Sequence, residues 1–339
     1  MPPVRLVDMR LELQQGNKSP FSLPLQEALA ETLLAGQQAI LYLNRRGTAS
    51  YVFCRDCGHV VRCPRCEVPL AWHSAEARLR CHHCNYQRQM PRRCPACRSQ
   101  HIRQYGLGAE AVEAALQKFF PSARTLRLDQ DAVRQNNAAH LLHYFRNRQA
   151  DVLIGTQMLA KGFDFPHVAL VGVILAEVGL YFPDPFAGER VFQLLTQVAG
   201  RAGRSATGGQ VIFQTYHPEH YVLQAAAAHD VNRFYQQELA YRRQMGYPPF
   251  SRLLRLEFRH REAETAEHRA AALADRLRAW MQAENRRELA LIGPAPAFFS
   301  RRDGKYRWQI ILRGPNPAAF LRGRLPADWL AEVDPTSLL

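Results

Sequence analysis

The sequence lacks two short motifs on which nucleotide-binding domains commonly depend. It contains no Gly-x4-Gly-Lys-[Ser/Thr] segment, and no Asp-Glu dipeptide occurs in its 339 residues. The first motif cradles phosphates through backbone amides, and the second supplies a carboxylate that holds magnesium. We therefore expect that this chain alone does not hold the β- and γ-phosphates of a nucleotide.

Long apolar runs are also missing. None approaches the ~20 residues of a membrane span, and the N-terminus, Met-Pro-Pro-Val-Arg, does not resemble a signal peptide. We expect no membrane partner and a cytoplasmic location, where thiols stay reduced. Lysine is scarce, with four among 44 basic residues. The net charge of +14 favours a polyanionic partner such as nucleic acid, although an arginine bias can also follow from genome composition.

Cysteine is absent from most of the chain and dense in one segment. All eight cysteines form Cys-x-x-Cys pairs, which are Cys54/Cys57, Cys63/Cys66, Cys81/Cys84 and Cys94/Cys97. A two-residue spacer lets both thiolates of a tight turn reach one tetrahedral ion, and two such turns complete a four-sulfur site. The spacing predicts two zinc ions. Disulfides or a redox pair are the alternatives, but disulfides need an oxidising compartment, and redox chemistry rarely uses four pairs.

Each Cys-x-x-Cys turn forms a zinc knuckle, and loop lengths favour a nested pairing of the four knuckles. The 14 residues between Cys66 and Cys81 match the spacing of a zinc ribbon, whereas joining the first two knuckles would leave only five residues to turn around one ion. We expect Cys54, Cys57, Cys94 and Cys97 on one zinc, and Cys63, Cys66, Cys81 and Cys84 on the other. Eight sulfurs fill both shells, so we expect the nearby histidines to be solvated; these are His59, His73, His82 and His83.

Outside the cysteines, the apolar pattern alternates between strands and helices. We expect helices at residues 22–36, 108–120, 137–148 and 189–198, and strands at 39–43, 124–128, 151–155, 168–175 and 209–216. This alternation predicts a parallel α/β sheet with both faces covered. The cysteine segment would be an insertion too poor in aliphatic residues to fold without metal.

The pattern changes after this sheet. We expect a long helix at residues 217–244, a breaker at 246–249, and then an α+β domain with a helix at 263–283, a short closing helix, and strands at 253–258, 289–292 and 308–312. The predicted division is therefore residues 1–50 and 100–216 for the parallel lobe, 51–99 for the two-zinc insertion, and 217–339 for the C-terminal domain.

Three stretches of the lobe carry candidate functional residues. Residues 197–204 place Gln197, Arg201 and Arg204 at a helix end, and fixed guanidinium groups are what a γ-phosphate needs in its transition state. The alternative is a tight helix end with solvated arginines. The other two stretches follow the ends of two predicted strands, at the sheet edge where such folds bind ligands. The candidate residues after one strand are Gly155, Thr156, Gln157, Lys161, Gly162 and Asp164, and those after the other are Asn44, Arg45 and Arg46.

A fourth candidate surface lies in the last domain. Residues 298–308 mix four aromatic side chains with four cations, namely Arg301, Arg302, Lys305 and Arg307. Such a surface can stack unpaired bases and neutralise phosphates, or receive an acidic peptide. The alternative is a hairpin whose aromatic rings pack in the core while its cations face solvent.

Taken in this order on one sheet, the three stretches of the lobe resemble motifs IV, V and VI of superfamily-two helicases. With the eight-cysteine insertion, the chain closely resembles the PriA family of primosomal replication-restart helicases from about residue 4 to 335, including residues 42–47, 106–110 and 247–249. The resemblance implies a RecA-like second helicase lobe, an inserted two-zinc cysteine module and an α+β C-terminal domain. It covers only the C-terminal half of the family's pattern.

The resemblance also implies roles for individual residues. Arg201 and Arg204 would sense the γ-phosphate, and Gln197 would lie beside the nucleotide. Thr156 and Gln157 would couple the DNA backbone to the cleft, and Asp164 would face the ribose or the opposing lobe. The chain departs from the family between motifs V and VI, where an Asp-x-Asp reads Leu175 and Glu177, and a Phe-Arg reads Pro185-Phe186.

Two functional hypotheses follow. The resemblance implies the C-terminal part of an ATP-dependent 3′–5′ DNA helicase that recognises stalled or recombined forks and initiates primosome assembly. ATP and magnesium would then bind only with a first lobe supplied in cis or trans. Its implied partners are branched or single-stranded DNA, single-strand DNA-binding protein and other primosome components, in the nucleoid of a bacterial cytoplasm. The alternative is a non-catalytic, zinc-bearing DNA-binding or assembly module; a zinc ribbon of transcription or translation would leave the three stretches unexplained.

Overall fold

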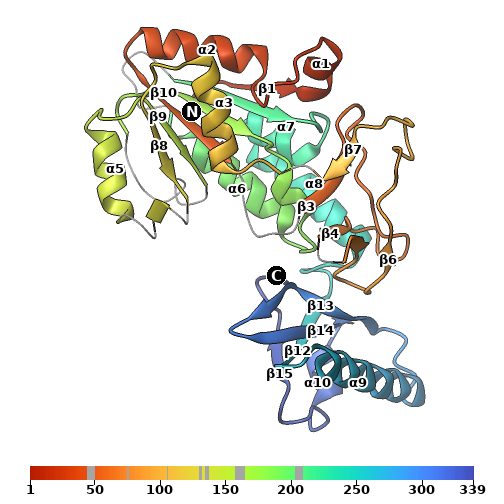
Figure 1. Cartoon of the computed structure of the whole chain (residues 1–339). Helices are drawn as coiled ribbons and strands as arrows, with labels where there is room; N and C mark the ends of the chain where they lie inside the picture. The colour runs from red at the N-terminus through yellow and green to blue at the C-terminus, as the bar shows by residue number, and fades with distance from the viewer. Residues whose placement is uncertain are drawn as a thin grey trace.

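A computed structural model describes residues 1–43, 50–74, 76–104, 106–129, 132–133, 137–156, 165–202 and 209–339. Three sheets organise this part of the chain, one each in an α/β lobe, a cysteine-rich insertion and a C-terminal domain. Figure 1 shows the C-terminal domain in blue below the lobe, with the orange insertion reaching down between them at one side.

The lobe is built on a six-stranded sheet in the order β1-β11-β10-β2-β9-β8, with every neighbouring pair parallel. Its strands are β1 (Val4–Asp8), β2 (Gln38–Leu43), β8 (Thr125–Leu128), β9 (Val152–Gly155), β10 (Val168–Ile174) and β11 (Gln210–Thr215). The central strands β2, β9 and β10 are buried along their whole length. They read as continuous apolar runs because helices cover both faces of the sheet.

Within the part of the chain that the structure describes, helices pack on both faces of this sheet. One face carries α2 (Leu23–Leu34) and α3 (Ala109–Phe119), and the other carries α5 (Ala138–Arg146), α6 (Ala187–Ala199) and α7 (Tyr221–Ala227). Strand β1 and the short helix α1 (Met9–Gln14) were not predicted, because residues 4–14 mix charged and apolar side chains without a clear period. The predicted parallel α/β sheet is confirmed.

The predicted single helix at residues 217–244 is wrong. The chain forms α7 and then α8 (Val231–Met245), and the left-handed backbone of His229 (φ 53°) separates them. Asp230 caps α8 by accepting a hydrogen bond from the Arg233 amide. An aspartate is a typical first residue of a helix, but the apolar pattern of residues 217–244 continues across it. Since α7 also packs into the lobe's core, that core extends past residue 216, the predicted end of the lobe.

The insertion forms a small five-stranded sheet in the order β6-β5-β4-β3-β7. Its strands are two to five residues long: β3 (Ser50–Cys54), β4 (Ala71–His73), β5 (Arg78–Arg80), β6 (Gln87–Arg88) and β7 (Ile102–Gln104). Buried cysteines contribute much of its core, alongside Val52, Leu70 and Leu79.

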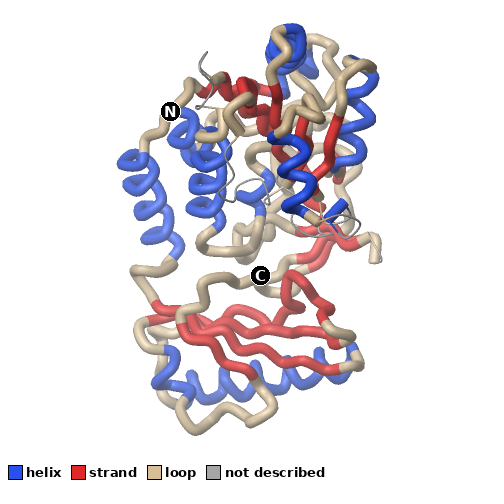
Figure 2. Tube along the Cα trace, turned by 90° about the vertical axis from the view of Figure 1, so that its left-hand side faces the viewer, coloured by secondary structure: helices blue, strands red, loops and turns tan. Residues whose placement is uncertain are grey.

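The C-terminal domain packs one long helix against an antiparallel sheet in the order β13-β14-β12-β15. Its elements are β12 (Arg252–His260), α9 (Ala263–Ala283), β13 (Ala290–Arg302), β14 (Lys305–Gly314), α10 (Pro317–Leu321) and β15 (Leu330–Val333). In Figure 2, α9 lies on the side of the sheet away from the lobe, and the C-terminus lies between the two units. β13 is longer than predicted because it continues through Gly293, Pro294 and Pro296, residue types that usually mark the end of a strand. β14 is longer because charged residues extend it on both sides of its apolar centre.

Candidate metal centres and motor residues

The eight cysteine sulfurs gather in two groups of four. One group holds Cys54, Cys57, Cys94 and Cys97 and the other holds Cys63, Cys66, Cys81 and Cys84, with the sulfurs of each group within 4.8 Å of one another. This grouping follows the nested order that loop lengths favoured. All eight cysteines are free thiols rather than disulfides.

Each knuckle turns in the same way. The amide of the residue after the second cysteine donates to the carbonyl of the first cysteine, as between Gly58 and Cys54. That following residue has a left-handed backbone in all four knuckles, at Gly58 (φ 77°), Glu67 (φ 56°), Asn85 (φ 60°) and Arg98 (φ 61°). Cysteine spacing alone does not reveal this fifth position, although the glycine and asparagine favoured by such a conformation occupy two of the four sites.

The sulfur geometry suits a tetrahedral zinc ion. Four ligands at a Zn–S distance of about 2.3 Å lie about 3.8 Å apart, and the sulfurs of Cys54 and Cys97 are 3.6 Å apart, those of Cys57 and Cys94 3.7 Å. A disulfide needs about 2.05 Å. Burial raises the pKa of the Cys84 thiol to about 11, so a bound cation would be needed to hold this side chain as a thiolate at neutral pH.

The neighbouring histidines are not all solvated, which corrects our expectation. The side chains of His82 and His83 are buried, with residue exposures of 2% and 4%. His82 Nδ1 lies 3.1 Å from the Pro296 carbonyl oxygen and His83 Nε2 lies 3.4 Å from that of Pro183. Because each histidine contacts a backbone carbonyl of another unit, both serve as packing groups between units.

The motor residues predicted at the strand ends are only partly described. Gly155 ends β9, and the half-buried Thr156 follows it at the carboxyl edge of the sheet. The other residues predicted for these two stretches lie outside the described residues, and so does Arg204 of the third stretch. Those of the first two stretches are Asn44, Arg45, Arg46, Gln157, Lys161, Gly162 and Asp164.

Gln197 and Arg201 lie on and just after helix α6. Gln197 is exposed and Arg201 is half-buried. The chain after Arg201 reaches the start of β11, because a Cβ on Gly209 would meet the Ala202 carbonyl at 1.7 Å. Thr156 follows the carboxyl end of a parallel strand, so it and Arg201 lie toward opposite edges of the sheet. The described residues therefore place these two groups apart within the lobe.

The hairpin β13–β14 separates the four predicted cations. Arg301, Arg302 and Lys305 are exposed at its tip, and the Arg301 guanidinium lies over the Tyr306 ring at 5.3 Å. Arg307 is different, since its side chain is 5% exposed and pairs with Glu257 at 2.6 Å. Burial and this ion pair make Arg307 a structural residue, which corrects its place among the candidate contacts.

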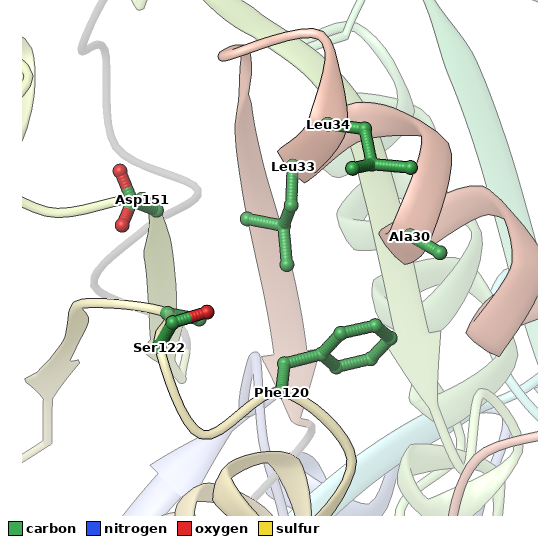
Figure 3. Close-up of a pocket in the computed structure, with 7 residues that line it drawn as sticks. Ala30, Leu33, Leu34, Phe120, Ser122 and Asp151 are labelled. Atoms are coloured by element: carbon green, nitrogen blue, oxygen red, sulfur yellow. The ribbon is translucent and has the colours of Figure 1, made fainter.

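A shallow pocket of about 350 Å³ lies elsewhere on the lobe (Figure 3). Leu33 and Leu34 of α2 and Phe120 after α3 face it, together with Asp151 just before β9. It opens at the amino edge of the sheet, and none of the predicted site residues lines it.

Three family models match the chain. They are the PriA DNA helicase Cys-rich region domain at residues 63–89, the helicase conserved C-terminal domain at residues 99–206, and the primosomal protein N C-terminal domain at residues 243–334. The second match and the parallel sheet confirm a RecA-like helicase lobe, and the first agrees with the cysteine clusters in indicating zinc binding.

Curated relatives named replication restart protein PriA match nearly the whole chain. The Bacillus subtilis protein is 45% identical over 92% of this chain and 38% of its own length, and the Synechocystis protein is 42% identical over 100% and 40%. The Treponema pallidum protein is 40% identical over 100% of this chain and 52% of its own length. The chain thus spans about two fifths to one half of these relatives.

Solved structures give weaker similarities. The Pyrococcus furiosus Hef helicase domain has a TM-score of 0.26 at 17% identity, covering 56% of this chain and 24% of that one. The Mycobacterium smegmatis helicase Lhr bound to ssDNA and AMP-PNP has a TM-score of 0.33 at 15% identity, covering 70% and 22%. Both are too weak to support a functional assignment. The domain matches and the curated relatives are decisive, and by them the chain belongs to the PriA family of replication restart proteins.

Proposed function

We propose that this chain forms part of an ATP-dependent 3′–5′ DNA helicase that recognises stalled or recombined forks and initiates primosome assembly. The observation that carries the proposal is the pair of four-sulfur clusters inserted after β2 of a parallel helicase lobe. Its curated relatives are named replication restart proteins. In this function Arg201 and Arg204 would stabilise γ-phosphate charge during hydrolysis, with Gln197 beside the nucleotide.

The lobe would act with a second lobe that supplies the phosphate cradle and the magnesium carboxylate. Neither motif occurs in the sequence, so ATP and magnesium would bind between this lobe and a partner lobe in cis or trans. Thr156, Gln157 and the neighbouring Lys161, Gly162 and Asp164 would link DNA to that cleft, as would Asn44, Arg45 and Arg46. We place the complex in the bacterial cytoplasm, associated with the nucleoid.

We propose that the cysteine clusters hold two structural zinc ions. Four-sulfur sites with closed shells contribute folding free energy rather than catalysis. The insertion needs this contribution because its strands are only two to five residues long. Cys54, Cys57, Cys94 and Cys97 would bind one ion, and Cys63, Cys66, Cys81 and Cys84 the other.

Two surfaces would contact the partners of this helicase. The insertion carries ten arginines against three acidic residues between positions 50 and 104, which favours the phosphates of branched or single-stranded DNA. The exposed Arg301, Arg302 and Lys305 at the β13–β14 tip would contact DNA or an acidic segment of single-strand DNA-binding protein, one of several primosome components. Among the described helices, none combines the length and apolarity that a bilayer crossing requires.

A reconstitution assay tests the motor. We expect the chain alone to show no DNA-stimulated ATP hydrolysis, and a mixture with the amino-terminal remainder of a PriA relative to show it. Arg201→Ala should then lower turnover by about 10³-fold, as for an arginine that stabilises phosphoryl transfer. Arg261→Ala, an exposed arginine of the C-terminal domain, is the control and should leave turnover unchanged.

The assay also separates the alternative function. If the reconstituted mixture binds forked DNA and zinc but shows no hydrolysis, the chain is a non-catalytic assembly module. Turnover by the chain alone that Arg201→Ala abolishes would instead show that the phosphates are held by residues we have not identified.

A further inference from the structure

The knuckle Cys81–Cys84 lies between the lobe and the C-terminal domain. Its two spacer residues, His82 and His83, contact different units, since the hydrogen-bond partner of His82 is Pro296 in β13 and that of His83 is Pro183 before α6. The Gln309 side chain of β14 also donates to the His82 carbonyl at 3.4 Å. One knuckle therefore bridges the lobe, at Pro183, and the C-terminal domain, at Pro296.

The hydrogen bonds of His82 have a definite direction. The Pro296 carbonyl only accepts, so His82 Nδ1 must donate to it across the 3.1 Å contact. In the neutral ring Nε2 is then an acceptor, and it lies 3.1 Å from Nε2 of His73, which must donate. Both nitrogens of His82 are thereby used within the protein, and neither is free to bind a metal.

Aromatic packing reinforces the same joint. The Phe298 ring of β13 lies 5.2 Å from the His82 ring and 5.3 Å from the Phe182 ring of the lobe. Phe298 is 5% exposed and belongs to the apolar core of the lobe rather than to that of its own domain. The C-terminal domain is thus anchored by a buried ring next to the knuckle.

The lobe side of the joint lies at the start of α6. Asp184 follows Pro183, and its fully buried carboxylate accepts hydrogen bonds from the Ser337 hydroxyl (2.8 Å) and the Leu338 amide (3.0 Å). Arg190, on the first turn of α6, pairs with the same carboxylate at 3.1 Å. Arg201 follows the other end of this helix, so the joint and the candidate motor arginine are connected by one rigid element.

From these contacts we propose that the second cluster, formed by Cys63, Cys66, Cys81 and Cys84, is a joint that fixes the C-terminal domain on the lobe through His82 and His83. The inference rests on the proposed zinc occupancy, because the metal would hold the short knuckle in the conformation that these contacts need. The first cluster is used for comparison, because Gly58, which follows its Cys57, packs on Tyr216 and His217 of the lobe.

Hydrogen exchange of the full chain tests the joint. We compare the parent with Cys81→Ser/Cys84→Ser, which removes the second zinc, and Cys94→Ser/Cys97→Ser, which removes the first. Loss of the second zinc should make amides in residues 295–300 and 337–339 exchange about tenfold faster, as expected when local contacts open. Loss of the first zinc should change them less than about twofold. Equal effects of both variants, or no effect of either, would overturn the proposal.

A second variant keeps the metal and removes only the contact. His82→Phe preserves the ring but not its hydrogen bonds, so we expect two zinc ions per chain and faster exchange in residues 295–300. His268→Phe, on the exposed face of α9, is the matched control and should leave both unchanged. A parent without zinc would refute the proposed metal sites alone, whereas unchanged exchange in His82→Phe would refute the joint.

Discussion

At the scale of single residues, Gly58 shows why a knuckle tolerates only certain side chains. Its backbone is left-handed, and a Cβ at this position would lie 2.5 Å from the Tyr216 carbonyl oxygen. We therefore expect Gly58→Ala to destabilise the chain by at least about 2 kcal/mol, combining backbone strain with a steric clash.

Thermal unfolding of the zinc-loaded chain measures this loss. Glu67→Ala is a suitable control, because Glu67 has the same left-handed backbone in another knuckle (φ 56°) and an exposed side chain. We expect it to shift stability by less than about 0.5 kcal/mol. A Gly58→Ala protein as stable as the parent would show that the first knuckle does not pack on the end of β11 as described.

Glu177 is a residue whose charge opposes folding. It is fully buried, and burial raises its pKa to about 6, although the Tyr216 amide donates to its carboxylate at 3.1 Å. Because the folded pKa exceeds the unfolded value of about 4.3, the folded state binds its proton more tightly. Its contribution to stability is therefore fully present below pH ~4.3 and is lost as the pH rises through about 6.

The substitution Glu177→Gln keeps an acceptor oxygen and removes the charge. At pH 7.5 it should raise the free energy of unfolding by about 2 kcal/mol, and at pH 4 it should have little effect. Urea unfolding at the two pH values measures the difference. A loss of stability at pH 7.5 would mean that the ionised carboxylate has a stabilising partner, and our account of this residue would be wrong.

At the scale of elements, α6 and α8 are joined by a buried ion-pair network. Arg242 of α8 pairs with Glu238 at 2.7 Å and with Glu189 of α6 at 2.8 Å, and its guanidinium lies over the Phe186 ring. Glu238 also accepts a hydrogen bond from the Tyr221 hydroxyl of α7 at 2.6 Å. The network fixes the start of α6 against the two helices that follow the sheet.

Removing the cation should be costly because it leaves a buried carboxylate unpaired. We expect Arg242→Met to lower the melting temperature in line with a loss of about 3–5 kcal/mol, and Glu238→Gln in the same chain to restore part of it. The adjacent Arg243→Met is the control, since Arg243 stacks on the exposed Phe250 ring. Similar effects of Arg242→Met and Arg243→Met would contradict the network.

The elements that the sequence predicted well are those with strong local signals. Helix α9 has the predicted bounds, and every strand of the parallel sheet except β1 lies within one or two residues of its predicted position because apolar runs and breakers mark it. The break between α7 and α8 was missed because apolar residues continue across it. β15 was missed because its four residues are all exposed and carry no pattern of burial.

The candidate sites were predictable to different degrees. Spacing alone suggested the two sulfur groups, since a knuckle is a local structure whose partner is limited by loop length. The roles of His82 and Arg307 were not predictable, because the partners Pro296 and Glu257 lie 214 and 50 residues away in sequence. Such long-range packing leaves no local pattern in the sequence.

At the scale of the whole molecule, the cysteine insertion connects the helicase lobe to the C-terminal domain. Gly58 near the first cluster contacts the end of β11, and His82 and His83 of the second contact β13 and the segment before α6. A metal that orders the insertion would thereby order the whole chain. We expect zinc removal by a chelator to loosen both interfaces and not only the insertion.

The central claim is that two closed four-thiolate centres hold this arrangement together. Metal analysis of the purified chain tests it most directly. We predict about two zinc ions per chain, falling to about one in Cys81→Ser/Cys84→Ser and, separately, in Cys94→Ser/Cys97→Ser. A parent with no zinc or one zinc, or sulfurs found oxidised to disulfides, would contradict the account.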